Sequence, residues 1–154
     1  AGSGIIHQEM PKPSERMLGF QLWLNLPSKN KMAEPKYHGI SKEEIPEVNE
    51  DHCKIHIIAG TYNGKQGSVK GDYVNPLYLD VEVNPDSEWF MDTDKSATLF
   101  VYILQGEGAF GPDTDKFITA KHAILFNEGN KLKLKASSKG IRFILMSATP
   151  LSEP

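Results

Sequence analysis

The sequence has few of the features that mark secreted, membrane or nucleic-acid-binding proteins. Its one cysteine, Cys53, excludes an internal disulfide framework and fits a reducing compartment. No apolar run approaches the roughly 20 residues of a membrane helix, and no signal-peptide pattern opens the chain. A net charge of -3, from 17 basic and 20 acidic residues, gives no basic surface for phosphates. These absences favour a soluble cytoplasmic protein without a membrane or a direct nucleic-acid partner.

No segment has a convincing helical period, and short alternating runs take its place. Residues 77–83 alternate apolar and polar side chains, and residues 131–135 place leucines on one face and lysines on the other. This alternation is typical of antiparallel strands with one wet side. Many short strands separated by Gly, Pro, Asn and Asp predict an all-β sandwich or barrel. Strands are expected at residues 54–59, 77–83, 98–104, 117–118, 123–126, 131–135 and 141–146, with a turn at 105–108.

The first third of the chain divides into an extended part and a polar part. Gly19–Pro27 alternates Phe and Leu with polar residues and Trp23, which predicts a half-buried strand ended by proline. Residues 28–50 are polar and are broken by Pro35 and Pro46. A stretch of this length without its own structure is uncommon inside a domain, so we expect a linker between two domains.

His7 and Glu9 are candidate metal ligands. In an extended segment, residues two apart point to the same face, so the imidazole and the carboxylate lie side by side. Such a pair suits Fe(II), Mn(II), Ni(II) or Cu(II). Two ligands do not hold a transition metal, so at least one more is needed. A surface histidine beside a solvated glutamate is the alternative interpretation.

Several segments in order resemble one family. They are Gly4–Pro11, Gly19–Pro27, Lys31–Tyr37, Glu44–Pro46, Ile58–Gly60, Pro76–Asp80, Tyr102–Gly106, Arg142–Leu145 and Pro150–Pro154, and together they resemble the pirin family, a bicupin branch of the cupin superfamily. The resemblance implies an N-terminal cupin that binds one metal through three His and one Glu, and a second cupin without metal. His7 and Glu9 match the last two ligands, and the other two belong to a His-x-His element upstream of residue 1.

The resemblance also implies the domain organisation. The fold class is a cupin jelly-roll barrel, with one nearly complete barrel plus the last strands of a preceding one. Residues 1–27 are the remnant of the metal-binding cupin, 28–50 the linker, and 51–154 a C-terminal cupin-like domain without metal ligands. We expect an internal piece of a longer protein, because no Met opens the chain. A naturally truncated family member remains the alternative.

The second barrel offers no obvious metal site. Gly4-Ile-Ile-His7 has its counterpart in Gly129-Asn-Lys-Leu132, where leucine replaces the ligand. His52 and Cys53 are adjacent and face opposite sides of a strand, which disfavours a zinc site with His56. The interior is therefore expected to be packed with side chains. Trp23 and Trp89 are interpreted as core or inter-domain packing.

Two functions remain open from the resemblance. The first is a quercetin-dioxygenase-type oxygenase, with Fe(II) or another divalent transition metal on His7 and Glu9 and a flavonol-like aromatic substrate; Glu9, when detached, is a catalytic base. The second is a non-enzymatic, iron-dependent redox-sensing module with a protein partner, which would be nuclear in a eukaryote. The isolated chain is expected to be inactive and metal-poor, and exposed barrel edges favour a dimer.

Overall fold

The computed structural model of the 154-residue chain describes residues 2–112 and 115–153. They belong to two compact units, residues 1–39 with 151–154, and residues 40–150. The first unit contains the short 3-10 helix η1 (Ser28–Asn30). The second contains the 3-10 helix η2 (Lys42–Glu44) and the strands β1 (Glu47–Glu50), β2 (Cys53–Ala59), β3 (Thr61–Tyr62), β4 (Lys65–Gln66), β5 (Leu77–Val83), β6 (Glu88–Asp92), β7 (Thr98–Phe110), β8 (Ile118–Thr119), β9 (Ala123–Leu125) and β10 (Lys131–Ala148).

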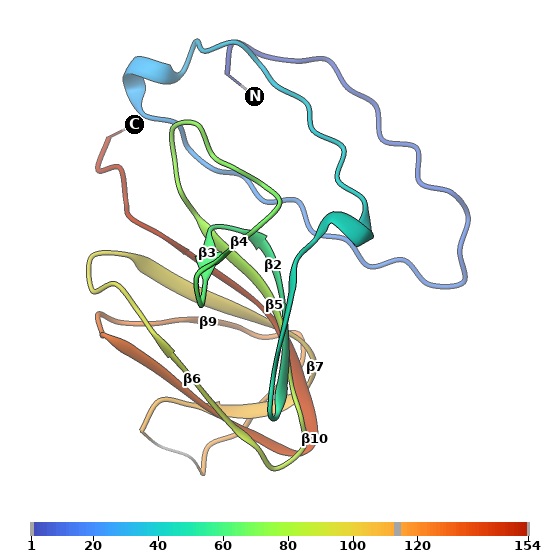
Figure 1. Ribbon diagram of the computed structural model, residues 1–154, viewed down its shortest axis with the longest axis vertical. Coiled ribbons are helices and arrows are strands. Elements are labelled where there is room, and N and C mark those ends of the chain that lie inside the picture. The colour runs from blue at the N-terminus through green and yellow to red at the C-terminus, as the bar shows by residue number, and fades with distance from the viewer. Residues whose placement is uncertain (1, 113–114, 154) are drawn as a thin grey trace. The chain divides into compact units, whose positions relative to one another are not determined.

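Strand β10 pairs with three other strands of the second unit, β5, β6 and β7 (Figure 1). The sheet order is β1-β2-β5-β10-β7-β8, with β6 also on β10 and β9 on β7, while β3 and β4 form a separate hairpin. The first part of β10 pairs with β6 and the last part with β5, and β7 pairs with both parts. All these pairs are antiparallel. This is the all-β cupin jelly roll that the sequence predicted.

Alternating apolar residues fill the interior of the barrel. Leu79 and Val81 of β5 lie beside Ile55 and Ile57 of β2, and all four are fully buried. Burying each such side chain contributes roughly 1.5–3 kcal/mol. Further along the barrel an aromatic cluster closes the core, with Trp89 against Phe143 and Phe143 against Phe110, each at 5.8 Å between ring centroids. The expectation of a packed interior, with Trp89 in it, is confirmed.

The expected turn at Gln105–Gly108 is wrong, because β7 continues through it. Gly106 has φ +72° and Gly140 on β10 has φ +68°, and the ladder between the two strands shifts register there. A Cβ on Gly106 would overlap the carbonyl oxygen of Gly140. The glycine therefore serves a bulge within paired strands rather than a hairpin tip. The two strands expected at 131–135 and 141–146 are likewise one strand, β10.

The first unit has no strand in its described residues. The expected strand at Gly19–Pro27 is wrong, and Trp23 within it is 85% exposed rather than buried in a core. A strand needs a hydrogen-bonded partner, and the described residues supply none. Instead, Glu153 accepts hydrogen bonds from the Ser28 backbone N–H (3.0 Å) and hydroxyl (2.6 Å). Part of the expected linker is also structured, because Glu47–Glu50 forms β1.

Candidate functional site

His7 and Glu9 lie in an irregular part of the first unit. Nδ1 of His7 is 3.9 Å from Oε1 of Glu9, so the two side chains are neighbours, as their spacing predicted. Both are open to solvent, with side-chain exposures of 53% and 74%. The described residues of this unit do not form a barrel around them. The two side chains are therefore close together, but the described residues do not bury them.

The pair supplies a donor set for part of a metal site. An imidazole nitrogen and a carboxylate oxygen suit a divalent transition metal of the Fe(II) kind. Within residues 2–112 and 115–153, however, no group of three or more His, Cys, Asp or Glu side chains is placed to hold a metal ion. His7 and Glu9 therefore fit such an ion as two ligands of a larger set, and they need further ligands to retain it.

The other histidine and cysteine candidates lie in different surroundings. Nε2 of His56 is 3.1 Å from Oε2 of Glu47, across the β1–β2 pair. Cys53 points into the core at 7% exposure, whereas its neighbour His52 is exposed. Leu132, which stands where the resemblance would place a ligand, is buried in the core at 3% exposure.

A second candidate site surrounds Glu50 at the end of β1. Glu50 Oε1 accepts hydrogen bonds from the Tyr62 hydroxyl and from Nδ2 of Asn63, each at 2.8 Å, and Oε2 accepts one from the Cys53 thiol at 3.3 Å. The Tyr62 hydroxyl in turn accepts a hydrogen bond from Nε1 of buried Trp89 at 3.2 Å. Hydrogen bonds to a charged group are stronger than neutral ones, so this network holds the carboxylate in one position.

The network also determines the protonation of its donors. Burial and the hydrogen bond to Glu50 raise the pKa of the Cys53 thiol from 9.0 to about 12. The same two causes raise the pKa of Tyr62 far above its usual value of 10.0. Both groups are therefore protonated donors near neutral pH, and Cys53 is not a reactive thiolate.

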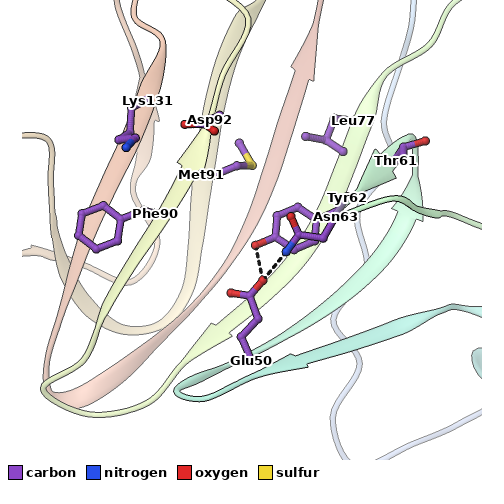
Figure 2. A pocket seen from close by; sticks show the side chains of 9 residues that line it. All are labelled: Glu50, Thr61, Tyr62, Asn63, Leu77, Phe90, Met91, Asp92 and Lys131. Atoms are coloured by element: carbon purple, nitrogen blue, oxygen red, sulfur yellow. Dashed lines mark hydrogen bonds between the residues drawn. The ribbon is translucent and has the colours of Figure 1, made fainter.

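The Glu50 network forms one wall of a pocket of about 460 Å³ (Figure 2). Glu50, Tyr62 and Asn63 lie on one side of the pocket, and residues of β6 lie on the other. The volume is within the roughly 300–1,000 Å³ usual for ligand pockets. The full lining consists of Glu50, Thr61, Tyr62, Asn63, Leu77, Phe90, Met91, Asp92 and Lys131.

Sequence reasoning missed this pocket. Most of its lining comes from β1, the β3–β4 hairpin and β6, with Leu77 of β5 and Lys131 of β10 added. Strands were expected at residues 77–83 and 131–135, but of β1, the hairpin and β6 only the hairpin turn at Asn63-Gly64 carried a local signal. Glu50 was placed in a linker, and β6 was not predicted. No spacing along the chain indicates that Glu50, Tyr62 and Trp89 meet, because strand pairing brings them together.

Comparisons with known proteins agree on one family. Residues 78–154 match the profile of the pirin C-terminal cupin domain. Over its whole length the chain is 38% identical to Pirin-1 of Arabidopsis thaliana and 35% identical to Pirin of Homo sapiens. It covers 54% and 53% of those proteins, so it spans about half the length of the curated relatives it matches.

The fold matches a solved enzyme of related architecture. The crystal structure of quercetin 2,3-dioxygenase from Acinetobacter baumannii is similar over 86% of this chain and 46% of that chain. The TM-score is 0.76 and the sequence identity 27%. The likeness therefore covers sequence as well as fold.

Proposed function

Because the chain belongs to the pirin family of bicupin proteins, we propose that the intact protein is a metal-dependent oxygenase of the quercetin 2,3-dioxygenase type. His7 and Glu9 are two of its metal ligands in this proposal. The observation that carries it is the likeness to the Acinetobacter baumannii quercetin 2,3-dioxygenase, with a TM-score of 0.76 at 27% identity. Nδ1 of His7 and Oε1 of Glu9 are 3.9 Å apart, which is compatible with two ligands of one ion.

Each residue of the pair has a defined task. His7 offers an imidazole nitrogen, and Glu9 offers a carboxylate oxygen 3.9 Å from it. A bound divalent transition metal supplies a Lewis acid for the oxygen of a flavonol-like substrate. Glu9, when not coordinated, would accept a proton from a substrate hydroxyl as a general base. The remaining ligands come from outside the described residues.

A second candidate function is a non-enzymatic, iron-dependent regulatory module. The chain is more similar to proteins named pirin, at 35–38% identity, than to the solved dioxygenase at 27%. In that case the metal site alters a protein-binding surface instead of a substrate. His7 and Glu9 keep the same role as ligands, so the two candidates share a site and differ in what the site serves.

Quercetin turnover by the full-length, metal-loaded protein separates the two candidates. We expect carbon monoxide release with quercetin consumption, and loss of at least about tenfold in kcat for His7→Ala. Glu15→Gln is a matched control, because Glu15 is an exposed carboxylate of the same unit outside the pair. Full metal content without turnover would favour the regulatory module. Turnover that His7→Ala and Glu9→Gln leave intact would contradict the assignment of the site.

A further inference from the structure

One edge of strand β6 pairs with no strand among the described residues, and this edge is called its free edge. Within the described part of the chain β6 pairs only with β10, from Glu88 opposite Lys135 to Asp92 opposite Lys131. Just beyond the strand, the Thr93 N–H bonds to the Asn130 carbonyl at 3.0 Å. In an antiparallel ladder, hydrogen-bonded pairs alternate with pairs that bond outward. The residues of β6 that bond to β10 are therefore the odd-numbered ones.

The free edge thus presents the backbone groups of Glu88, Phe90 and Asp92. The carbonyl of Lys133, which is opposite Phe90, accepts a hydrogen bond from Gly111 on the far side of β10, at 2.9 Å. Lys133 accordingly turns its backbone away from β6, which agrees with the alternation. An unpaired row of N–H and C=O groups is a template for another strand.

The edge opens into the 460 Å³ pocket rather than onto a flat surface. Phe90, Met91 and Asp92 all line the pocket although successive side chains of a strand point to opposite faces. Three consecutive lining residues mean that the pocket follows the strand edge. The opposite wall is Glu50, fixed by its hydrogen bonds to Tyr62 and Asn63 (Figure 2).

The charged side chains that line the pocket favour a positively charged ligand. Glu50 and Asp92 contribute two carboxylates to the lining, against the single ammonium of Lys131. Neither Asp92 nor Lys131 has an ion-pair partner among the described residues, whereas Glu88 is paired with Lys133 at 3.2 Å. A small organic cation could meet the carboxylates, but only an extended chain also matches the regular spacing of the backbone groups.

We propose that the β6 edge binds an extended peptide segment carrying basic side chains, which adds one strand to the sheet beside Glu50. β6 has five residues, so the paired length is about 16 Å at roughly 3.3 Å per residue. Backbone hydrogen bonds at Phe90 hold the strand, and a lysine or arginine beside Asp92 sets its preference. The inference is independent of the proposed oxygenase site.

The first test is a titration of the isotopically labelled chain with acetyl-Lys-Val-Lys-Val-Lys-amide, followed by amide NMR. Chemical shifts should change at residues 88–92 and 61–63, and exchange of the Phe90 amide should slow. The charge-reversed peptide with Glu for Lys should bind at least about fivefold more weakly. Absence of binding at millimolar peptide, or shifts centred elsewhere, would overturn the proposal.

N-methylation of the peptide tests the backbone contact directly. In an added strand only alternate peptide N–H groups face β6, and a slip by one residue would exchange the faces of its side chains. Methylation at the valines and methylation at the lysines should therefore differ, with one pattern abolishing binding and the other sparing it. Equal binding of both methylated peptides would refute pairing with the edge.

Variants of the protein supply the reciprocal test. Phe90→Pro removes the outward N–H, and proline is tolerated where an edge N–H faces solvent. We expect affinity for the lysine peptide about tenfold below that of Phe90→Ala, which keeps the N–H. Asp92→Asn should weaken it two- to fivefold, about the size of one exposed ion pair, and Glu82→Gln on β5 should not. Equal affinities of the proline and alanine variants would contradict the proposal, and the methylated peptides decide it if the proline variant does not fold.

Discussion

Removing the hydroxyl of Tyr62 tests whether the Glu50 network stabilises the barrel. Tyr62 is 6% exposed and its hydroxyl joins Trp89 to Glu50 through bonds of 3.2 and 2.8 Å. Tyr62→Phe removes both bonds while leaving the ring against Trp89, at 6.4 Å between centroids. The change therefore isolates the hydrogen bonds from the packing.

The expected loss of unfolding free energy is about 2–4 kcal/mol. A hydrogen bond to a charged group contributes about 1.5–3 kcal/mol, and a buried donor left without a partner costs about 1–3 kcal/mol. The two contributions overlap, because relaxation of the Trp89 N–H toward Glu50 or water recovers part of the second. Against a typical domain stability of about 5–15 kcal/mol, this is a large fraction.

Urea unfolding at neutral pH, followed by tryptophan fluorescence, measures the loss. Tyr78→Phe is the matched control: Tyr78 is a half-buried tyrosine of β5 whose hydroxyl has no hydrogen bond among the described residues, and its substitution should change stability by under about 0.5 kcal/mol. In a double-mutant cycle, Tyr62→Phe and Glu50→Gln should be non-additive by at least about 0.5 kcal/mol. A loss below about 0.5 kcal/mol for Tyr62→Phe, or strict additivity, would refute the network as a source of stability.

Three further perturbations have defined outcomes. The pKa of the Cys53 thiol rises from 9.0 to about 12 on folding, so the thiol ionises first in the unfolded chain and stability falls as pH rises between these two values. In Cys53→Ala the free energy of unfolding should fall less steeply with pH, by up to about 1.4 kcal/mol per pH unit. An unchanged slope would show that the thiol is not the source of this pH dependence. Gly106→Ala should lower the free energy of unfolding in urea by about 2–4 kcal/mol, because φ is +72° and an added Cβ would overlap the backbone of Gly140. Gly129→Ala is the control, because a Cβ there meets open space and should cost under about 1 kcal/mol. Similar losses for the two variants would contradict the assignment of Gly106 to a bulge. Arg142→Lys should lower the free energy of unfolding by about 0.5–1.5 kcal/mol, since lysine cannot reproduce the two hydrogen bonds to Asp80 at 2.9 and 2.6 Å. Thermal unfolding measures this loss, and an unchanged stability would show that solvent screens the pair.

The strands of the barrel were predictable where side-chain alternation decided them. Leu77–Val83 was expected as a strand and is β5 with the same bounds, because its apolar residues face a continuous core. Gly106 misled the prediction, since a glycine between apolar runs indicates a turn and a bulge equally well. Glu88–Asp92 was missed as β6 because it is short and its register depends on the distant β10.

The same alternation failed in the first unit for a different reason. Gly19–Pro27 has the pattern of a half-buried strand but no strand beside it in the described residues. The alternation of apolar and polar side chains indicates which face of a segment can be buried, whereas a strand forms only where a neighbouring strand pairs with it.

The two candidate sites differ in how sequence could reveal them. The resemblance to pirins pointed to His7 and Glu9, and their spacing correctly predicted that the side chains are neighbours. Their role as metal ligands stays a prediction. Neither a family resemblance nor residue spacing indicated the Glu50 pocket, because Glu50, Tyr62 and Trp89 are separated along the chain and meet only in the folded barrel.

Metal analysis of the full-length protein tests the assignment of His7 and Glu9 most directly. After iron loading and desalting, elemental analysis should find close to one transition-metal ion per chain in the natural protein, and under about one tenth of that in His7→Ala and in Glu9→Gln. The 154-residue chain treated in the same way should retain little metal, since the pair alone provides two ligands. Full metal content in both full-length variants would contradict the account.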